Sequence, residues 1–301
     1  MKHIKPVELF LTLGLVATLG ACATPTPEGG EGGEGEKTEE SHNHGGEGGE
    51  GEEDHSHGGE GGEGGEGEED HSHGGEGGEG GEGGEGGEGG EGGNSGNADV
   101  DYVTALALMQ GHLLVADELI TQGSYEEAEP HVGHPVEELY GDVEEVLPEK
   151  GVDDFKNTLN EFHDLIKTTP DAPEVKVAYS DSVKAIDVAL GAMSEQLDSP
   201  EFTITIVNNM LRVAAEEYEA AIADGKFVEV VEYQDSRGFV LYAETLYGNI
   251  ADQMDAEANE AITVAFEELK TAWPEVNPPD APILEPSEVF GLVAEIELKS
   301  K

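Results

Sequence analysis

Histidines that lie near carboxylates are the residues in this sequence best suited to do chemistry. His134 and Glu137 are three positions apart at the expected start of a helix, so their side chains share one face. His131 comes one turn earlier. Imidazole and carboxylate groups are ligands for zinc, copper, nickel and iron. We therefore predict a divalent metal site at His131, His134 and Glu137.

Two further histidines, His112 and His163, each lie beside an apolar helical face. If the helices converge, both imidazoles would complete the same site. The alternative is that each is a core or boundary histidine whose hydrogen bonds are satisfied locally.

Three His-x-His pairs occur further upstream, each with one residue between the two histidines. In an extended chain, side chains two positions apart point the same way, so each pair can present two imidazoles to one ion. We expect low-affinity metal binding here, although a repetitive spacer that carried histidines along by duplication would look the same. The pairs are His42 and His44, His55 and His57, and His71 and His73.

These pairs belong to residues 28–97, which hold 32 of the 44 glycines, 21 Glu and no apolar residue. Such a segment has no apolar area to offset the entropy lost on ordering, and its charges repel each other. We predict a disordered Gly/Glu/His-rich stalk.

The N-terminus has the order of an export signal: Lys2 and Lys5, an apolar run, then small residues. Leu19-Gly20-Ala21-Cys22 resembles a bacterial lipobox. The resemblance implies a signal peptide at 1–21, a lipidated N-terminus at 22–27 with Cys22 carrying palmitate-type acyl chains, and a lipoprotein in the cell envelope. Ala23 and Thr24 favour the outer membrane, on its periplasmic or surface side.

Residues 98–301 carry apolar residues at steps of three and four, which indicates helices. Ser124 and Glu127 have the spacing of a capping box, and Pro130 and Gly133 predict a break soon after it. No segment alternates like a strand. We predict an all-α fold, an antiparallel bundle of about seven or eight helices.

The formal charge of the chain is −54, and residues 98–301 contribute 44 acidic and 11 basic residues, or −33. A surface that binds nucleic acid needs clustered Lys and Arg, so nucleic acid is excluded as a partner. The sequence has neither a His-Glu-x-x-His nor a Gly-x-Ser-x-Gly motif, and its single cysteine belongs to the lipobox. We therefore expect no enzymatic activity.

An exported helical domain with His134-x-x-Glu137 near its beginning resembles the imelysin-like proteins of metal uptake. The resemblance implies a membrane-anchored lipoprotein that captures, buffers or delivers a divalent metal, with a metal transporter or envelope protein as partner. Val132 and Gly133 depart from the Gly-x-His-x-x-Glu pattern of that family, so only His134 and Glu137 carry over. The alternative is a stalked helical interaction or envelope-structural module without a specific metal site.

Overall fold

The computed structural model describes residues 95–301, and these residues form an all-α fold with one small hairpin. The predicted fold class is confirmed. The long helices are α1 (Ala98–Gln122), α2 (Tyr125–His134), α5 (Lys156–Thr168), α6 (Glu174–Gly191), α8 (Pro200–Ala220), α9 (Val230–Ile250), α10 (Ala256–Leu269) and α11 (Pro286–Lys299). Shorter segments are the π-helix η1 (Pro135–Leu139), α3 (Tyr140–Glu144), α4 (Leu147–Lys150), α7 (Ser194–Leu197), and the 3-10 turns η2 (Ala251–Gln253) and η3 (Lys270–Ala272).

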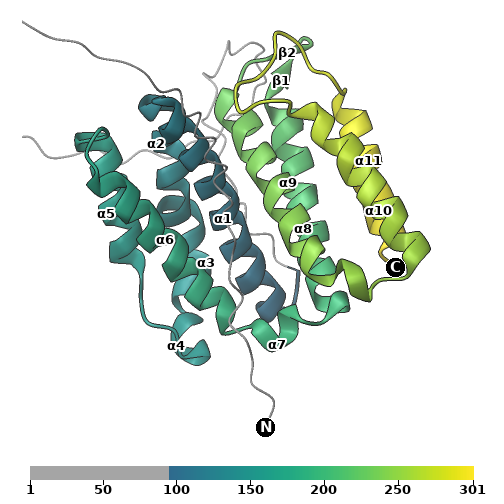
Figure 1. Ribbon diagram of the computed structural model, residues 1–301, viewed down its shortest axis with the longest axis horizontal. Helices are drawn as coiled ribbons and strands as arrows, with labels where there is room; N and C mark the ends of the chain where they lie inside the picture. Colours follow the sequence, from purple (N-terminus) through teal and green to yellow (C-terminus); the bar gives the residue numbers. More distant parts are fainter. Residues whose placement is uncertain (1–94) are drawn as a thin grey trace, which may run out of the picture. The chain divides into compact units, whose positions relative to one another are not determined.

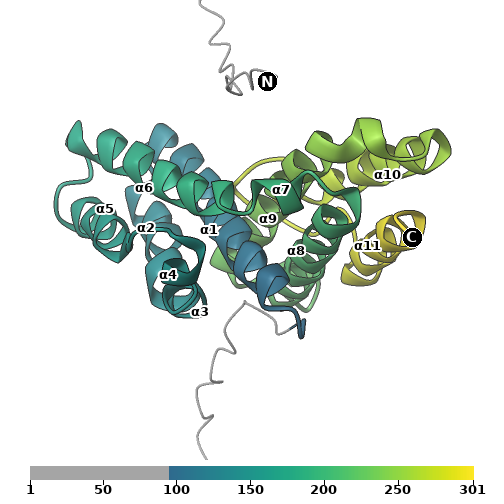
Figure 2. The same ribbon diagram turned by 90° about the horizontal axis from the view of Figure 1, so that it is seen from below.

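Helix α1 is the centre of this arrangement. Figure 2 shows α2 to α6 on one side of α1 and α8 to α11 on the other. Asn97 caps the start of α1 by accepting a hydrogen bond from the Asp99 amide, and Gly123 ends the helix in the left-handed conformation. Both ends of the central helix are therefore set by local sequence.

The hydropathy and length of α1 would also allow it to cross a membrane, and among the described residues it is the only helix of this kind. In the fold, 78% of that apolar window is buried against other helices. Packing on two sides therefore accounts for a helix that is apolar all round.

Two local expectations about the chain after α1 were wrong. Ser124 makes no side-chain capping hydrogen bond, and α2 continues through Pro130 and Gly133 to His134. Packing of α2 against α1, α5 and α9 compensates for the hydrogen bond that Pro130 removes.

The only strands in residues 95–301 are β1 (Ile222–Ala223) and β2 (Lys226–Phe227), an antiparallel pair in which Ile222 lies opposite Phe227. The turn between them uses Asp224 and Gly225, both with positive φ. This hairpin joins α8 to α9, which pack closely along their length, as Figure 1 shows. After the hairpin, α9 starts at Val230.

Candidate metal centre

A buried carboxylate, Asp235 on α9, lies between three imidazoles. Its Oδ1 is 2.6 Å from Nδ1 of His112 on α1 and 2.7 Å from Nδ1 of His131 on α2. Its Oδ2 is 3.2 Å from Nδ1 of His134, also on α2. Each of the four residues offers one ligand atom, and these atoms all lie within 4.8 Å of one another. We call these four residues the His/Asp cluster.

The cluster is buried and closed on most sides. His112, His131 and Asp235 have no exposed surface, whereas 18% of the His134 side chain is exposed. Ionisable groups are rarely fully buried unless they are paired or hold a metal. His134 therefore marks the side from which the cluster meets solvent.

Two glycines let α1 and α9 approach closely enough to form the cluster. A Cβ on Gly238 would lie 2.3 Å from the carbonyl oxygen of Gly111, and a Cβ on Gly111 would lie 2.7 Å from Cδ1 of Phe239. His112 directly follows Gly111 in the sequence, and Asp235 lies three residues before Gly238. The glycine contact therefore helps to set the distance between the imidazole and the carboxylate.

The position of His134 depends on the proline after it. Pro135 has no amide hydrogen, so it cannot donate to the carbonyl of His131, and the chain continues as the π-helix η1. Segments of π-helix are frequent at functional sites. In this one, Oε1 of Glu138 lies 3.7 Å from Nε2 of His134, on the opposite side of the ring from Asp235.

Electrostatics in the cluster favour a negative Asp235 beside cations. Burial raises the pKa of Asp235, but the charges and hydrogen bonds of His112 and His131 outweigh it and hold that pKa well below its usual range. Burial and the charge of His112 lower the pKa of His134, but Asp235 and Glu138 outweigh them and raise it above its ordinary value. The site therefore attracts positive charge, whether as protons or as a metal ion.

The raised pKa of His134 predicts a pH-dependent stability of the metal-free protein. A group whose pKa is higher in the folded state stabilises the fold below its unfolded pKa, about 6.5, and loses that contribution as pH rises through the folded value. His134→Asn should therefore reduce the free energy of unfolding more at acidic than at alkaline pH. Urea unfolding in the presence of a chelator at several pH values measures this. An equal loss at every pH would contradict the assignment.

The donor set fits a divalent transition metal. Three imidazole nitrogens and one carboxylate oxygen are ligands that zinc, iron, copper and nickel accept. Nδ1 of His134 and Oδ2 of Asp235 are buried and form an ion pair at 3.2 Å, and neither atom has another partner within residues 95–301. Coordination to one ion would satisfy both atoms, and the ion would compensate the charge of the buried carboxylate.

The structure brings together three of the histidines that the sequence singled out: His131, His134 and His112. It places Glu137 elsewhere: 60% of its side chain is exposed, and its Oε1 lies 3.6 Å from Nδ1 of His163. The other ring nitrogen of His163, Nε2, is 2.7 Å from Oε1 of Glu129. Neither Glu137 nor His163 is part of the His/Asp cluster. The widened turn of η1 brings Glu138 close to His134 instead.

The sequence pattern did not identify Asp235 as a ligand. The nearby Arg237 pairs with Glu118 on α1, with Nη1 2.5 Å from Oε2. One signal was present: Gln234, Asp235 and Ser236 form a polar run on α9, and all three are fully buried. Such a run needs polar partners from neighbouring helices.

Other predicted site residues lie outside the described residues. These are the lipidation site Cys22 and the histidines His42, His44, His55, His57, His71 and His73.

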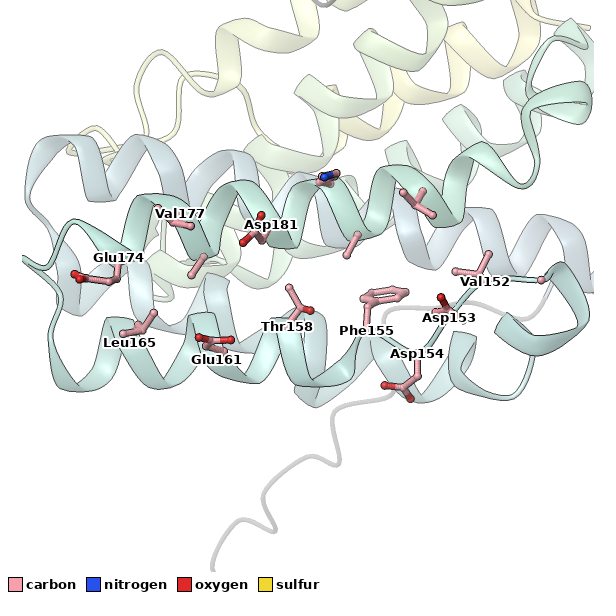
Figure 3. Close-up of a pocket in the computed structure, with 15 residues that line it drawn as sticks. Val152, Asp153, Asp154, Phe155, Thr158, Glu161, Leu165, Glu174, Val177 and Asp181 are labelled. Carbon is pink, nitrogen blue, oxygen red and sulfur yellow. The ribbon is translucent and has the colours of Figure 1, made fainter. Parts of the chain in front are cut away.

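A groove of about 580 Å³ lies between α5 and α6, away from the cluster. Figure 3 shows side chains of both helices lining it, among them Leu165 and Glu161 on α5 and Val177 and Asp181 on α6, together with Phe155, which directly precedes α5. No histidine or cysteine lines the groove. Its mixed acidic and apolar lining differs from the buried donor set of the His/Asp cluster, so the cluster is the better metal site.

Residues 193–301 match the family model described as the iron permease-associated 4-helix bundle domain. The matched residues include the four long helices α8, α9, α10 and α11. No curated protein and no solved structure matches the chain significantly. Asp235 lies inside the matched helices, whereas the three histidines of the cluster precede them.

Proposed function

We propose that this protein is a lipid-anchored protein of the bacterial cell envelope that binds a divalent metal ion at the His/Asp cluster and passes it to a transporter. The cluster carries the proposal: three Nδ1 atoms face one buried carboxylate, and Nδ1 of His134 and Oδ2 of Asp235 have no partner within residues 95–301 other than each other. A protein that binds and releases an ion needs such a donor set but no catalytic machinery, so we propose a binding protein rather than an enzyme.

The family match supports the choice of partner and of metal. Its description associates the helical bundle with iron permeases, and the matched helix α9 supplies Asp235. We therefore propose iron as the first candidate ion and a permease as the recipient. Zinc, copper and nickel would accept the same ligands.

In this proposal Cys22 anchors the chain to the membrane, and residues 28–97 hold the helical domain away from it. The six histidines of that segment would raise the local metal concentration as a weak binding site. The His/Asp cluster would supply the tight site, because its ligands are already positioned by helices.

The test is a metal-retention measurement on the full chain in which the six upstream histidines are replaced by alanine. After dialysis against a mixture of zinc, copper, nickel and iron(II), and then against a mild chelator, we expect about one retained ion per chain. Adding His131→Ala should abolish retention, because it removes a ligand from a buried site.

The matched control is His163→Ala, which removes a histidine outside the cluster and should leave retention unchanged. Elemental analysis provides the readout and names the metal. If the parent chain retains no ion, or if His131→Ala retains as much as the parent, the metal-binding function is refuted. An interaction module would then be the better account.

A further inference from the structure

The imidazole of His131 is held at both of its nitrogens. Nδ1 faces Oδ1 of Asp235 at 2.7 Å, and Nε2 faces Oε1 of Gln234 at 2.8 Å. His131, Asp235 and Gln234 are all fully buried, so water does not compete for these contacts. Gln234 and Asp235 are neighbours on α9, and their side chains contact the ring from opposite edges.

An amide oxygen can only accept a hydrogen bond, so Gln234 requires a proton on Nε2 of His131. A neutral ring with its proton on Nε2 has its lone pair on Nδ1. That lone pair lies 2.7 Å from a carboxylate oxygen, and two acceptors so close repel each other unless a cation lies between them. A proton or a metal ion meets this requirement.

We infer that Gln234 is a positioning residue of the metal site, which selects the tautomer in which His131 binds an ion through Nδ1. This inference rests on the proposed function. Histidine ligands of metals commonly donate their other N–H to a carbonyl or carboxylate, which fixes the ring and raises its basicity. The amide oxygen Oε1 of Gln234 faces the ring, and the amide nitrogen Nε2 has no hydrogen-bond partner within residues 95–301.

The geometry of His134 agrees with the same mode of binding. Its Nδ1 faces Asp235 and its Nε2 faces Glu138, although at 3.7 Å and in a more exposed setting. His112 also directs Nδ1 toward Asp235. All three rings therefore present the same nitrogen to the centre of the cluster, and Gln234 is the most buried of the outer acceptors described here.

The experiment measures zinc affinity in the chain whose six His-x-His histidines are replaced by alanine. It compares Gln234→Met with the same chain that keeps Gln234. Methionine has a similar length but no acceptor oxygen. We expect zinc affinity to fall by about 10- to 100-fold, the effect typical of losing such a contact. The melting temperature without metal should change little, because two effects oppose each other: the substitution leaves Nε2–H of His131 without its acceptor, and it removes the unpaired buried amide nitrogen of Gln234.

Two variants serve as controls. Gln234→Glu keeps an acceptor oxygen and should retain zinc affinity. Gln110→Met makes the same substitution at another buried glutamine, whose Nε2 donates to the carbonyl of Val183 at 3.2 Å and to Asp187 at 2.9 Å. That glutamine does not contact the cluster histidines, so zinc affinity should be unchanged.

Nitrogen-15 NMR of the zinc-loaded chain shows which ring nitrogen of His131 binds zinc. This result would not depend on Gln234 if that residue only stabilised the fold. We expect His131 to bind zinc through Nδ1 and to keep its proton on Nε2. Zinc on Nε2, equal zinc affinity in Gln234→Met, or an affinity loss that simply follows a lower melting temperature would each overturn the inference. If the parent chain binds no zinc or other ion, the proposed function fails and this inference fails with it.

Discussion

Replacing Asp235 with asparagine is expected to abolish retention of metal and to destabilise the fold by about 3–5 kcal/mol. The carboxylate is fully buried and contacts three imidazoles, and removing one partner of a buried charged group leaves the others uncompensated. An amide keeps the shape of the side chain but supplies neither the charge nor a second acceptor. Urea unfolding measures the loss of stability, and elemental analysis measures the loss of metal.

The control for this substitution is Asp187→Asn. Burial raises the pKa of Asp187, and its Oδ1 accepts a hydrogen bond from Gln110, which asparagine can still accept. We expect a change in unfolding free energy within about 0.5 kcal/mol and full metal retention. If both substitutions have the same effect, the loss at Asp235 reflects generic carboxylate removal and not the cluster.

The second large effect is expected from Gly238→Ala. The new Cβ would lie 2.3 Å from the carbonyl oxygen of Gly111 and 2.9 Å from Cγ2 of Val115, so α1 and α9 must move apart. We expect a loss of about 3 kcal/mol, near the upper end for overpacked cores, together with weaker metal binding. The second effect follows because His112 and Asp235 belong to the two helices that separate.

The same substitution at Gly248, on the same helix, gives the opposite expectation. That residue is exposed, and a Cβ there would meet nothing within 4 Å. Alanine should stabilise the helix by about 0.5–1 kcal/mol. Thermal unfolding of the two variants side by side separates the helix crossing from general helix propensity. Stabilisation by both would show that the crossing tolerates a side chain.

The helices were predictable because their apolar residues recur at helical spacing, and Pro200 and Pro286 each occupy the first position of a helix, where proline is favoured. The ends were less predictable where packing overrides local preference. Pro130 suggested a break, yet α2 continues because neighbouring helices bury one of its faces. The hairpin before α9 was also missed, since strands of two residues leave no alternating pattern.

The cluster was only partly predictable. His131 and His134 stood out by their spacing on one helix, which is local information. Their meeting with His112 and Asp235 depends on how α1, α2 and α9 pack, and Asp235 is 104 positions from His131. Glu137 was chosen by ideal α-helical spacing, and the π-helix that starts at Pro135 changes that spacing.

The cluster draws its three imidazoles from α1 and α2 and its carboxylate from α9, so any ion held there joins helices on both sides of α1. Ligand binding and unfolding are then thermodynamically linked, because the unfolded chain scatters these four side chains. Free metal at about 100 times its dissociation constant would add about 2.7 kcal/mol to the unfolding free energy. Delivery of the ion to a partner would withdraw that increment, leaving the emptied domain the easier form to unfold and to degrade.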